Sequence, residues 1–461
     1  MTTFHAESSI TRTFWRYAIP SIAAMVVSGL YQIIDGIFVG HYIGFEGLAG
    51  INMAWPAICI LGAIGVMIGM GTGSVMSIYR GENKLEKTKV ALTTGFWLLA
   101  ILSLIAITCI VLLAENILHA QGAEGKNFDF AMDYINVLMF GGFFTACATA
   151  LPMLVRNDES PNVATFLLVV GALINIVLDY LFIGVMGLGL SGAALATLIA
   201  QAVVTVLGIH YFFTKRSSIQ LSIKEVLFSR NKAKQSLMLG SSALVMYMYG
   251  SFVVAMHNAL MMHYGSATTV GAYAIVGYLF MLYYLLAQGI AEGAQPPISY
   301  YFGAKENKKV YQIFKLALKW VTITGVAWVA ILNISPELTT ALFTNGDQSL
   351  IAETIVGIRY HLFAMFLDGI IVLVTIYFLS VNEGKKAMVI SMSNIIIQLP
   401  FLLMLPKWFG IDGVWLAMPI SNIALIICIT PMVWRHLKAQ KIIKPLSVSQ
   451  VFTHQNSASI K

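Results

Sequence analysis

The sequence predicts an all-α integral membrane protein, with twelve transmembrane helices arranged as two pseudo-symmetric six-helix bundles. Hydropathy, the distribution of basic residues and an internal repeat support this fold. Of the 461 residues, 58% are apolar and only 11% are charged, and the mean hydropathy is +0.80. A soluble domain carries about 25% charged residues. A chain this apolar is therefore expected in a lipid bilayer.

Twelve apolar segments are long enough to cross about 30 Å of hydrocarbon. They lie near residues 15–40, 53–79, 89–114, 130–154, 162–184, 188–213, 236–263, 270–298, 311–335, 351–379, 387–405 and 411–434. The N-terminal stretch MTTFHAESSITRTFWRYAIP is too polar for a cleaved signal peptide, so the first apolar segment is expected to remain as a span. Four cysteines stand singly inside apolar segments, without a CxxC pair, and are predicted to be buried: Cys59, Cys109, Cys147 and Cys428.

The basic residues follow the positive-inside rule. With a cytoplasmic N-terminus, the termini, the even-numbered loops and the adjoining helix ends hold all 28 Lys and Arg except Lys126, Arg359 and Lys407. Both termini are therefore expected in the cytoplasm, and the protein in the cytoplasmic (inner) membrane. The net charge of +7 is then a topology signal and indicates no nucleic-acid partner.

A long polar connection divides the predicted spans six and six. The sequence accordingly predicts an N-terminal lobe at 1–213, a cytoplasmic linker at 214–235, a C-terminal lobe at 236–438 and a polar tail at 439–461. Within the linker, IKEVLFS is compatible with a short amphipathic segment at the membrane surface. We favour an ordinary linker between the bundles.

The two halves repeat each other. SIYRGENKLEK (77–87) matches SYYFGAKENKK (299–309) at an offset of 222, and GLSGAALA (189–196) resembles GIDGVWLA (410–417) at an offset of 221. With six spans per half, both halves have the same orientation in the membrane. Parallel repeats of this kind occur in secondary transporters, which bind substrate between the halves and alternate its access to either side.

Five charged residues lie well inside predicted spans: Asp35, Asp179, Glu292, Arg359 and Asp368. A charge at the centre of a membrane helix costs roughly 2.5–3.5 kcal/mol on the lenient insertion scale. Each is therefore expected to face a cavity or the bundle interior and is a candidate functional residue. The alternative is a paired structural ion, and this alternative is strongest for Glu292 because it lies near the end of a span.

Four polar residues are predicted to lie at similar depth in the outer half of the first bundle. Asn175 and Asp179 share one helix face in LINIVLDYLFIG, because they are four residues apart. At about 1.5 Å per residue, Asp35 in span one and Thr197 in span six come to nearby depths. Two clustered carboxylates either share a proton or hold a cation. An ion-coupled transporter needs such a group.

The second half has no equivalent group, since Asp35 corresponds to His257 at an offset of 222 and Asp179 to Pro400 at 221. His210, His257 and His361 are isolated, without an HxxxH or HExxH pattern, and are predicted to pack rather than bind metal. The glycine-rich IGMGTGS lacks a following GK[ST], which favours close helix packing over nucleotide binding.

On these residues the chain resembles the multidrug and toxic compound extrusion (MATE) transporters, over about residues 10–438. The shared features are AIP at 18–20 with Asp35 in span one, S-x-x-x-G after spans two and eight, and N-x-x-x-D followed by Thr in spans five and six. EGAQPPISYYFGA (292–304) looks closest to the bacterial branch that includes the MepA type.

The resemblance implies that Asp35, Asn175, Asp179 and Thr197 form a cation site for Na⁺ or a proton, as in DinF-like members, with no other cofactor. Asp368 resembles a cation-site aspartate of the NorM branch. The acidic residue that this branch carries in span seven is missing from 236–263. A second cation or substrate site at Asp368, with Glu292, would therefore be incomplete.

We expect a monomeric antiporter that exports organic, mostly cationic compounds in exchange for Na⁺ or H⁺. Two alternatives remain open at this point. A flippase for lipid-linked saccharide precursors would be favoured by a basic central cavity. An intramembrane enzyme would need a nucleophile–base pair or a metal constellation, and the sequence offers neither.

Overall fold

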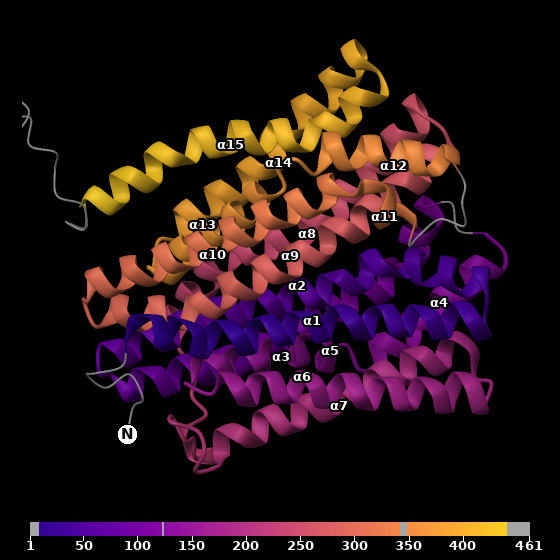
Figure 1. The fold of residues 1–461 in the computed structure, drawn as a ribbon. Coiled ribbons are helices and arrows are strands. Elements are labelled where there is room, and N and C mark those ends of the chain that lie inside the picture. Colours follow the sequence, from indigo (N-terminus) through magenta and orange to yellow (C-terminus); the bar gives the residue numbers. More distant parts are fainter. Residues whose placement is uncertain (1–8, 122–123, 342–347, 440–461) are drawn as a thin grey trace, which may run out of the picture.

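The computed structural model describes residues 9–121, 124–341 and 348–439 (Figure 1). All the regular elements in these residues are helical. They are α1 (Ile10–Tyr42), α2 (Phe45–Gly81), α3 (Leu85–Ala120), α4 (Lys126–Phe140), α5 (Gly142–Asn157), α6 (Pro161–Asp179), η1 (Tyr180–Val185), α7 (Gly189–Phe213), η2 (Ile223–Glu225), α8 (Arg230–Tyr264), α9 (Ala267–Gly303), α10 (Asn307–Ile334), α11 (Pro336–Ala341), α12 (Gln348–His361), α13 (Phe366–Ser380), α14 (Gly384–Phe409) and α15 (Ile411–Ala439).

The expected all-α membrane fold is confirmed. Ten of the described helices are long and apolar enough to span a membrane, and two bent pairs raise the number to twelve if each pair is one span. The pairs are α4–α5, bent by 64°, and α12–α13, bent by 45°. The segments predicted at 130–154 and 351–379 are thus broken helices. The first of these breaks lies at Gly141 and Gly142. A sharp kink costs little free energy there, because neither residue has a Cβ atom.

The helices form two lobes that lie side by side (Figure 1). Helices α1–α7 make up the N-terminal lobe, and α8–α15 make up the C-terminal lobe. Between the lobes, α2 packs against α8 and α1 packs against α9. These two contacts are equivalent under the sequence repeat, because α1 corresponds to α8 and α2 to α9. The repeat is therefore visible in the packing as well as in the sequence.

Glycines at repeat-related positions let the lobes approach backbone to backbone. A Cβ atom on Gly81 of α2 would lie 2.0 Å from the carbonyl oxygen of Tyr300, and a Cβ on Gly303 of α9 would lie 2.0 Å from that of Ile78. Real Cβ atoms do not come this close, so both positions need glycine. Gly81 and Gly303 are 222 residues apart, which is the offset of the repeat.

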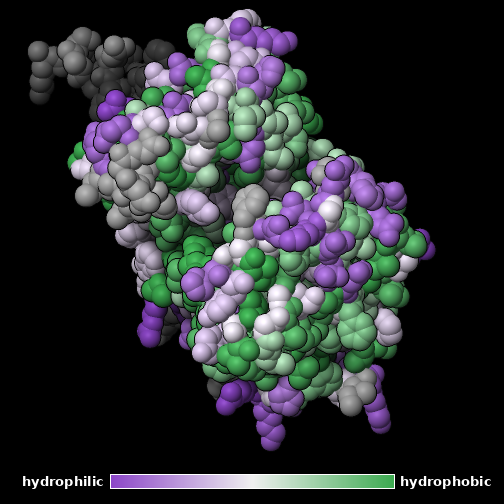
Figure 2. Space-filling view, turned by 90° about the vertical axis from the view of Figure 1, so that its right-hand side faces the viewer, coloured by the Kyte–Doolittle hydropathy of each residue, from purple (hydrophilic) through white to green (hydrophobic). Residues whose placement is uncertain are grey.

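The lobes are in closest contact at one end of the molecule, which we call the basic end. It comprises the start of α1, the end of α15 and the connections at 82–84, 158–160, 214–229, 304–306 and 381–383. This end lies to the left in Figure 1. Figure 2 looks onto the opposite end and shows a hollow between the two lobes.

The connection between the lobes is held against the N-terminal lobe. Lys89 Nζ lies 2.7 Å from Glu225 Oε1, and the Thr93 hydroxyl donates to the Leu227 carbonyl at 2.7 Å. The hydrogen bond from Lys89 holds the pKa of Glu225 below its ordinary value. The IKEVLFS segment contains only a short 3₁₀ turn. It is an anchored linker, and α8 begins at Arg230, inside the predicted linker.

Two expectations about buried side chains are wrong in part. Cys59 and Cys147 are buried, but Cys109 and Cys428 are exposed on the outside of the bundle. Arg359, expected to face the bundle interior, is also exposed. An apolar run in a membrane protein places residues on the lipid-facing surface as well as in the core, so hydropathy alone does not distinguish the two.

Candidate functional site

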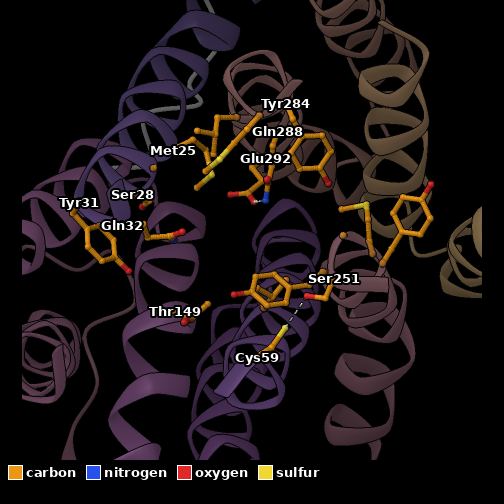
Figure 3. A pocket seen from close by; sticks show the side chains of 18 of the residues that line it. Met25, Ser28, Tyr31, Gln32, Cys59, Thr149, Ser251, Tyr284, Gln288 and Glu292 are labelled. Carbon is orange, nitrogen blue, oxygen red and sulfur yellow. Dashed lines mark hydrogen bonds between the residues drawn. The ribbon is translucent and has the colours of Figure 1, made fainter. Parts of the chain in front are cut away.

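A cavity of about 750 Å³ lies between the two lobes. Its walls come from both lobes, and among the lining residues are Met25, Ser28, Tyr31, Gln32, Cys59, Thr149, Tyr247, Ser251, Tyr278, Tyr284, Gln288 and Glu292 (Figure 3). Aromatic rings and methionines supply the apolar surface, and a few amides, hydroxyls and charges are placed among them. The volume lies within the roughly 300–1,000 Å³ of pockets for drug-sized ligands.

Asp179 lies at a break in the helix geometry. It is the last residue of α6 and is followed at once by the π-helix η1. Such local π-helices often occur at functional sites. Its side chain is completely buried, and in the part of the chain that the structure describes no N–H or hydroxyl donates a hydrogen bond to either carboxylate oxygen. Burial of an unpaired carboxylate is costly, so this group is a candidate ligand for a cation or a proton.

The structure brings the other three predicted residues next to Asp179. The carboxyl of Asp35 interacts with that of Asp179. The Asn175 amide donates to the Thr197 hydroxyl at 3.3 Å. Asp35 Oδ1 and Asn175 Oδ1 are buried, and neither has a hydrogen-bond partner among the described residues. We call Asp35, Asn175, Asp179 and Thr197 the N-lobe acidic cluster. Asn175 and Thr197 also line the central cavity.

Sequence reasoning missed one member of this neighbourhood. Tyr134 of α4 is buried, contacts the Thr197 hydroxyl and lies within electrostatic reach of Asp35 and Asp179. No sequence signal marks it, because its contact with Thr197 joins two helices that are far apart in the sequence. With Tyr134 included, the site offers carboxylate, amide and hydroxyl oxygens, which are the ligands that hard cations prefer.

Asp368 lies in the C-terminal lobe, on α13. It is buried and accepts a hydrogen bond from Asn422 Nδ2 at 2.8 Å. It lines both the central cavity and a small side pocket that includes Tyr249, Tyr284 and Asn394. Unlike Asp179, this carboxylate has a polar partner on α15. The structure does not join it directly to Glu292, although Tyr284 lies within electrostatic reach of both.

Glu292 forms an ion pair that joins the two lobes at the cavity wall. Arg156 Nη1 of α5 lies 2.9 Å from Glu292 Oε2, and both side chains are only 3% exposed. The second oxygen, Glu292 Oε1, accepts a hydrogen bond from Gln288 at 2.9 Å. From the sequence, Arg156 was counted among the residues that set topology. Its role as a partner of Glu292 was missed, since 136 residues separate the two.

A buried network of amides and hydroxyls continues from this ion pair toward the basic end. Asn157 donates to Gln295 at 2.9 Å, and Gln295 donates to Ser74 at 2.9 Å and to Ser299 at 3.1 Å. Ser77 donates to Asn157 at 2.7 Å. Three helices from two lobes therefore meet in one hydrogen-bonded group. These contacts hold the basic end closed in this conformation.

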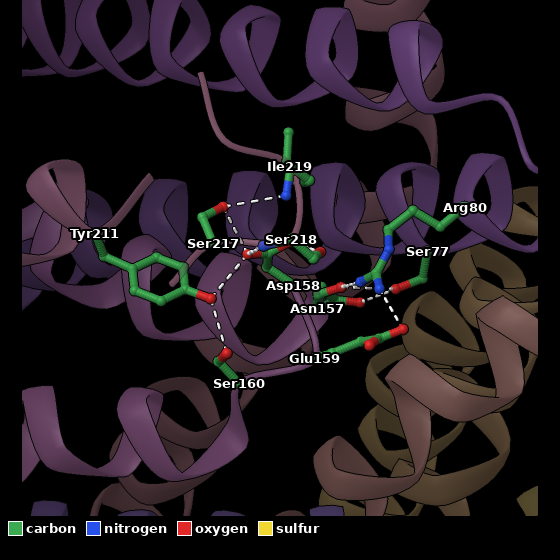
Figure 4. A network of polar contacts seen from close by, with 10 residues as sticks. All are labelled: Ser77, Arg80, Asn157, Asp158, Glu159, Ser160, Tyr211, Ser217, Ser218 and Ile219. Carbon is green, nitrogen blue, oxygen red and sulfur yellow. Dashed lines mark hydrogen bonds and ion pairs between the residues drawn. The ribbon is translucent and has the colours of Figure 1, made fainter. Parts of the chain in front are cut away.

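A second network ties the α5–α6 connection to the lobe linker (Figure 4). Asp158 accepts hydrogen bonds from Tyr211 at 2.8 Å, from Ser217 at 2.8 Å and from Ser218. Its neighbour Glu159 pairs with Arg80. Burial raises the pKa of Asp158, although the Arg80 charge and these hydroxyls act against the rise. The network fixes the linker in place.

Two histidines predicted to be isolated are in contact. The rings of His257 on α8 and His361 on α12 lie 5.3 Å apart. His257 stacks on Tyr273, and His361 meets Tyr273 and Trp415 edge to face. His257 Nδ1 is 2.9 Å from the Val253 carbonyl, and His361 Nδ1 is 2.9 Å from the Trp415 carbonyl. His210 is exposed. No group of three or more metal-ligating side chains occurs among the described residues.

Comparison with known proteins agrees with this architecture. The family model MatE matches residues 20–181 and 243–404. The multidrug export protein MepA of Staphylococcus saprophyticus is 24% identical over 415 residues, which is 89% of this chain and 90% of that protein. MepA of Staphylococcus aureus strain MRSA252 is 22% identical over 411 residues, covering 89% and 90% of the two chains. The crystal structure of MATE in complex with MaL6 matches with a TM-score of 0.88 at 23% identity, covering 95% of this chain and 98% of that one.

Proposed function

The chain belongs to the MatE family, and we propose that it is a multidrug efflux transporter that exchanges organic, mostly cationic compounds for Na⁺ or H⁺. Family membership and the likeness to the multidrug export protein MepA support export of small organic compounds. A cavity of about 750 Å³ with aromatic, methionine and amide side chains suits ligands of varied shape.

One observation carries the coupling proposal. The N-lobe acidic cluster buries four oxygen atoms that receive no hydrogen bond from an N–H or hydroxyl group of the described residues: Asp35 Oδ1, Asn175 Oδ1 and both carboxylate oxygens of Asp179. Since an unsatisfied buried polar atom is expensive, such a group favours binding of Na⁺ or of a shared proton. The coupling ion binds there, next to the cavity wall formed by Asn175 and Thr197.

The mechanism follows from competition for negative charge. A coupling cation that binds at Asp35 and Asp179 neutralises the acidic cluster and weakens the cavity's attraction for an organic cation. Substrate release and ion entry are then linked. If the bound ion lowers the affinity for the organic cation, the bound organic cation lowers the affinity for the ion by the same factor. With the basic end in the cytoplasm, this conformation faces outward, since the lobes are packed at that end and separated at the other.

The same orientation supports a proposal for the cellular location. The basic connections between helices lie at one end of the molecule, and basic loops stay in the cytoplasm. We therefore place the protein in the inner membrane of a bacterial cell, with both termini in the cytoplasm. One chain contains both lobes and the whole cavity, so a monomer suffices for transport.

Transport in liposomes tests this proposal. Purified protein is reconstituted with ethidium as the transported cation, and a Na⁺ gradient or a pH gradient is imposed in separate experiments. Gradient-driven ethidium movement is expected with one of the two ions and is absent from protein-free liposomes. Movement that is equally fast without either gradient would contradict antiport.

The flippase alternative receives no support from the cavity. Among the described lining residues Arg156 is the one Lys or Arg, whereas Glu292 and Asp368 are both acidic. Arg156 is paired with Glu292 in this conformation. One arginine beside two acidic residues gives the cavity wall no excess of positive charge to neutralise the diphosphate of a lipid-linked saccharide.

A further inference from the structure

The ion pair between Arg156 and Glu292 depends on the contact between the lobes. Arg156 belongs to α5 of the N-terminal lobe and Glu292 to α9 of the C-terminal lobe. Beside the pair, a Cβ atom on Gly293 would lie 2.7 Å from Ala18 Cα, and one on Gly289 would lie 2.7 Å from Ile22 Cα. Backbones this close must separate when the basic end opens. The 2.9 Å ion pair cannot survive that separation.

Opening the basic end would leave the Glu292 carboxylate without its arginine. Glu292 points into the cavity, with Gln288 bound to one of its oxygens (Figure 3). The freed carboxylate leaves an uncompensated negative charge at the cavity wall, so a cation that enters the cavity is attracted to it. Gln288 remains one turn away and keeps the carboxylate oriented toward the cavity.

The α9 face around Glu292 matches the chemistry of a flat organic cation. Tyr284, Gln288 and Glu292 are spaced four residues apart, so they form one stripe along the cavity side of the helix (Figure 3). A tyrosine ring attracts both aromatic surface and positive charge. Met25 of α1 faces the same region of the cavity and supplies polarisable apolar contact.

We propose that Glu292 is the countercharge for the organic cation while the basic end is open, and that Arg156 displaces the cation from it when the basic end closes. This proposal rests on the multidrug export function and names the charge-recognition residue of the same cavity. Arg156 then competes with the organic cation for the Glu292 carboxylate. The outward-facing cavity cannot recapture the exported cation at Glu292, because that carboxylate is already occupied by the guanidinium.

Binding measurements separate this proposal from a purely structural ion pair. Ethidium affinity is measured by fluorescence anisotropy on protein in nanodiscs, which requires neither transport nor an ion gradient. Glu292→Gln is expected to weaken ethidium binding roughly tenfold, because it removes the carboxylate that pairs with the cation. Arg156→Gln is expected to tighten binding by a similar factor, because it frees that carboxylate from the guanidinium. The double variant Arg156→Gln/Glu292→Gln should bind as weakly as Glu292→Gln.

A purely structural pair predicts a different pattern, in which both single variants shift the affinity in the same direction. That pattern, or unchanged affinity in both variants, would overturn the proposal. Glu46→Gln is the matched control, because Glu46 pairs with Lys126 on the exposed surface, away from the cavity. The ethidium affinity of this variant should equal that of the wild type. Arg156→Lys keeps a positive charge beside Glu292, so it should restore the competition that Arg156→Gln removes, and equally tight ethidium binding in both Arg156 variants would contradict displacement by charge.

Failure of this inference is distinguishable from failure of the proposed function. If the wild type moves ethidium under a gradient while the two variants do not diverge, Glu292 and Arg156 lack the assigned roles and export still stands. If the wild type neither binds ethidium nor transports it, both proposals are wrong.

Discussion

The two lobes share a scaffold and differ in their polar chemistry. Gly81 and Gly303 make repeat-related contacts across the interface, which shows how closely the packing of the halves agrees. At the depth of Asp35, however, the C-terminal lobe has His257, whose ring stacks on Tyr273. Asp179 corresponds to a proline. The duplicated unit thus retained the residues that set backbone distance and diverged in those that bind charge.

The difference extends to how each buried carboxylate is satisfied. Asp179 receives no hydrogen bond from an N–H or hydroxyl group among the described residues, whereas Asp368 accepts a hydrogen bond from Asn422 at 2.8 Å. A buried carboxylate that accepts a hydrogen bond from the protein is less unfavourable without a bound ion than one that accepts none. This difference supports the proposal that ion coupling belongs to the N-terminal lobe, and the following experiments test that asymmetry.

Removal of charge from the acidic cluster should have the largest effect. Asp35→Asn and Asp179→Asn are each expected to reduce gradient-driven ethidium efflux by roughly 5- to 150-fold, the span of typical coupling free energies. Asp368→Asn should reduce it far less. Initial efflux rates from liposomes, normalised to reconstituted protein, give the comparison. Equal losses in all three variants would remove the asymmetry between the lobes.

Closure of the basic end should be equally sensitive to an added methyl group at the corresponding glycine of each repeat. A Cβ on Gly71 would lie 2.1 Å from the Ser236 carbonyl oxygen, and one on Gly293 would lie 2.7 Å from Ala18 Cα. Gly71→Ala and Gly293→Ala should each destabilise the packed conformation by about 1–3 kcal/mol, the usual cost of overpacking. Gly250→Ala is the control, because nothing lies within 4 Å of its added Cβ.

Cross-linking measures this closure. In a background without the four natural cysteines, Tyr79→Cys and Gln235→Cys place one thiol on each lobe, at positions whose native side chains are hydrogen bonded between the lobes at 3.2 Å, and a bifunctional thiol reagent bridges them. Cross-linking should slow in Gly71→Ala and Gly293→Ala and stay normal in Gly250→Ala. A normal rate in both interface variants would mean that these close contacts do not control the conformation.

A smaller difference is expected at the turns after the fourth and tenth spans. Asp158 is buried and accepts hydrogen bonds from Tyr211, Ser217 and Ser218. Glu383 pairs with Lys386 at 3.1 Å near the surface. Asp158→Asn should lower the free energy of unfolding by about 1–3 kcal/mol, since an amide cannot accept all these bonds. Glu383→Gln should cost less than about 1 kcal/mol.

Thermal unfolding in detergent ranks the two turn variants. A clearly lower midpoint is expected for Asp158→Asn, with Glu383→Gln close to the wild type. The reverse order would show that the linker network of Figure 4 contributes little to stability.

Much of the fold could be predicted from the sequence, because hydropathy and the repeat offset are signals that extend over whole helices. The all-α class and the number of apolar spans are confirmed, and membership of a transporter family confirms that the chain is not an enzyme. The bends inside the fourth and tenth spans were not predicted. Hydropathy averages over such local breaks.

The candidate site was only partly predictable, for a physical reason. Asn175 and Asp179 are neighbours on one helix, so spacing places them on the same face. Tyr134 and the Arg156–Glu292 pair depend on how separate helices pack, and spacing within one helix contains no information about those contacts. The His257–His361 contact was missed for the same reason, as 104 positions separate the two residues.

The central claim is that the coupling ion and the organic cation compete through the N-lobe acidic cluster. The most direct measurement is the ethidium affinity of nanodisc-embedded protein as a function of Na⁺ concentration and, separately, of pH. The affinity should fall as Na⁺ or H⁺ increases in the wild type and in Asp368→Asn, and it should be independent of both ions in Asp35→Asn and Asp179→Asn. Retention of the full ion dependence in Asp35→Asn and Asp179→Asn would contradict the account.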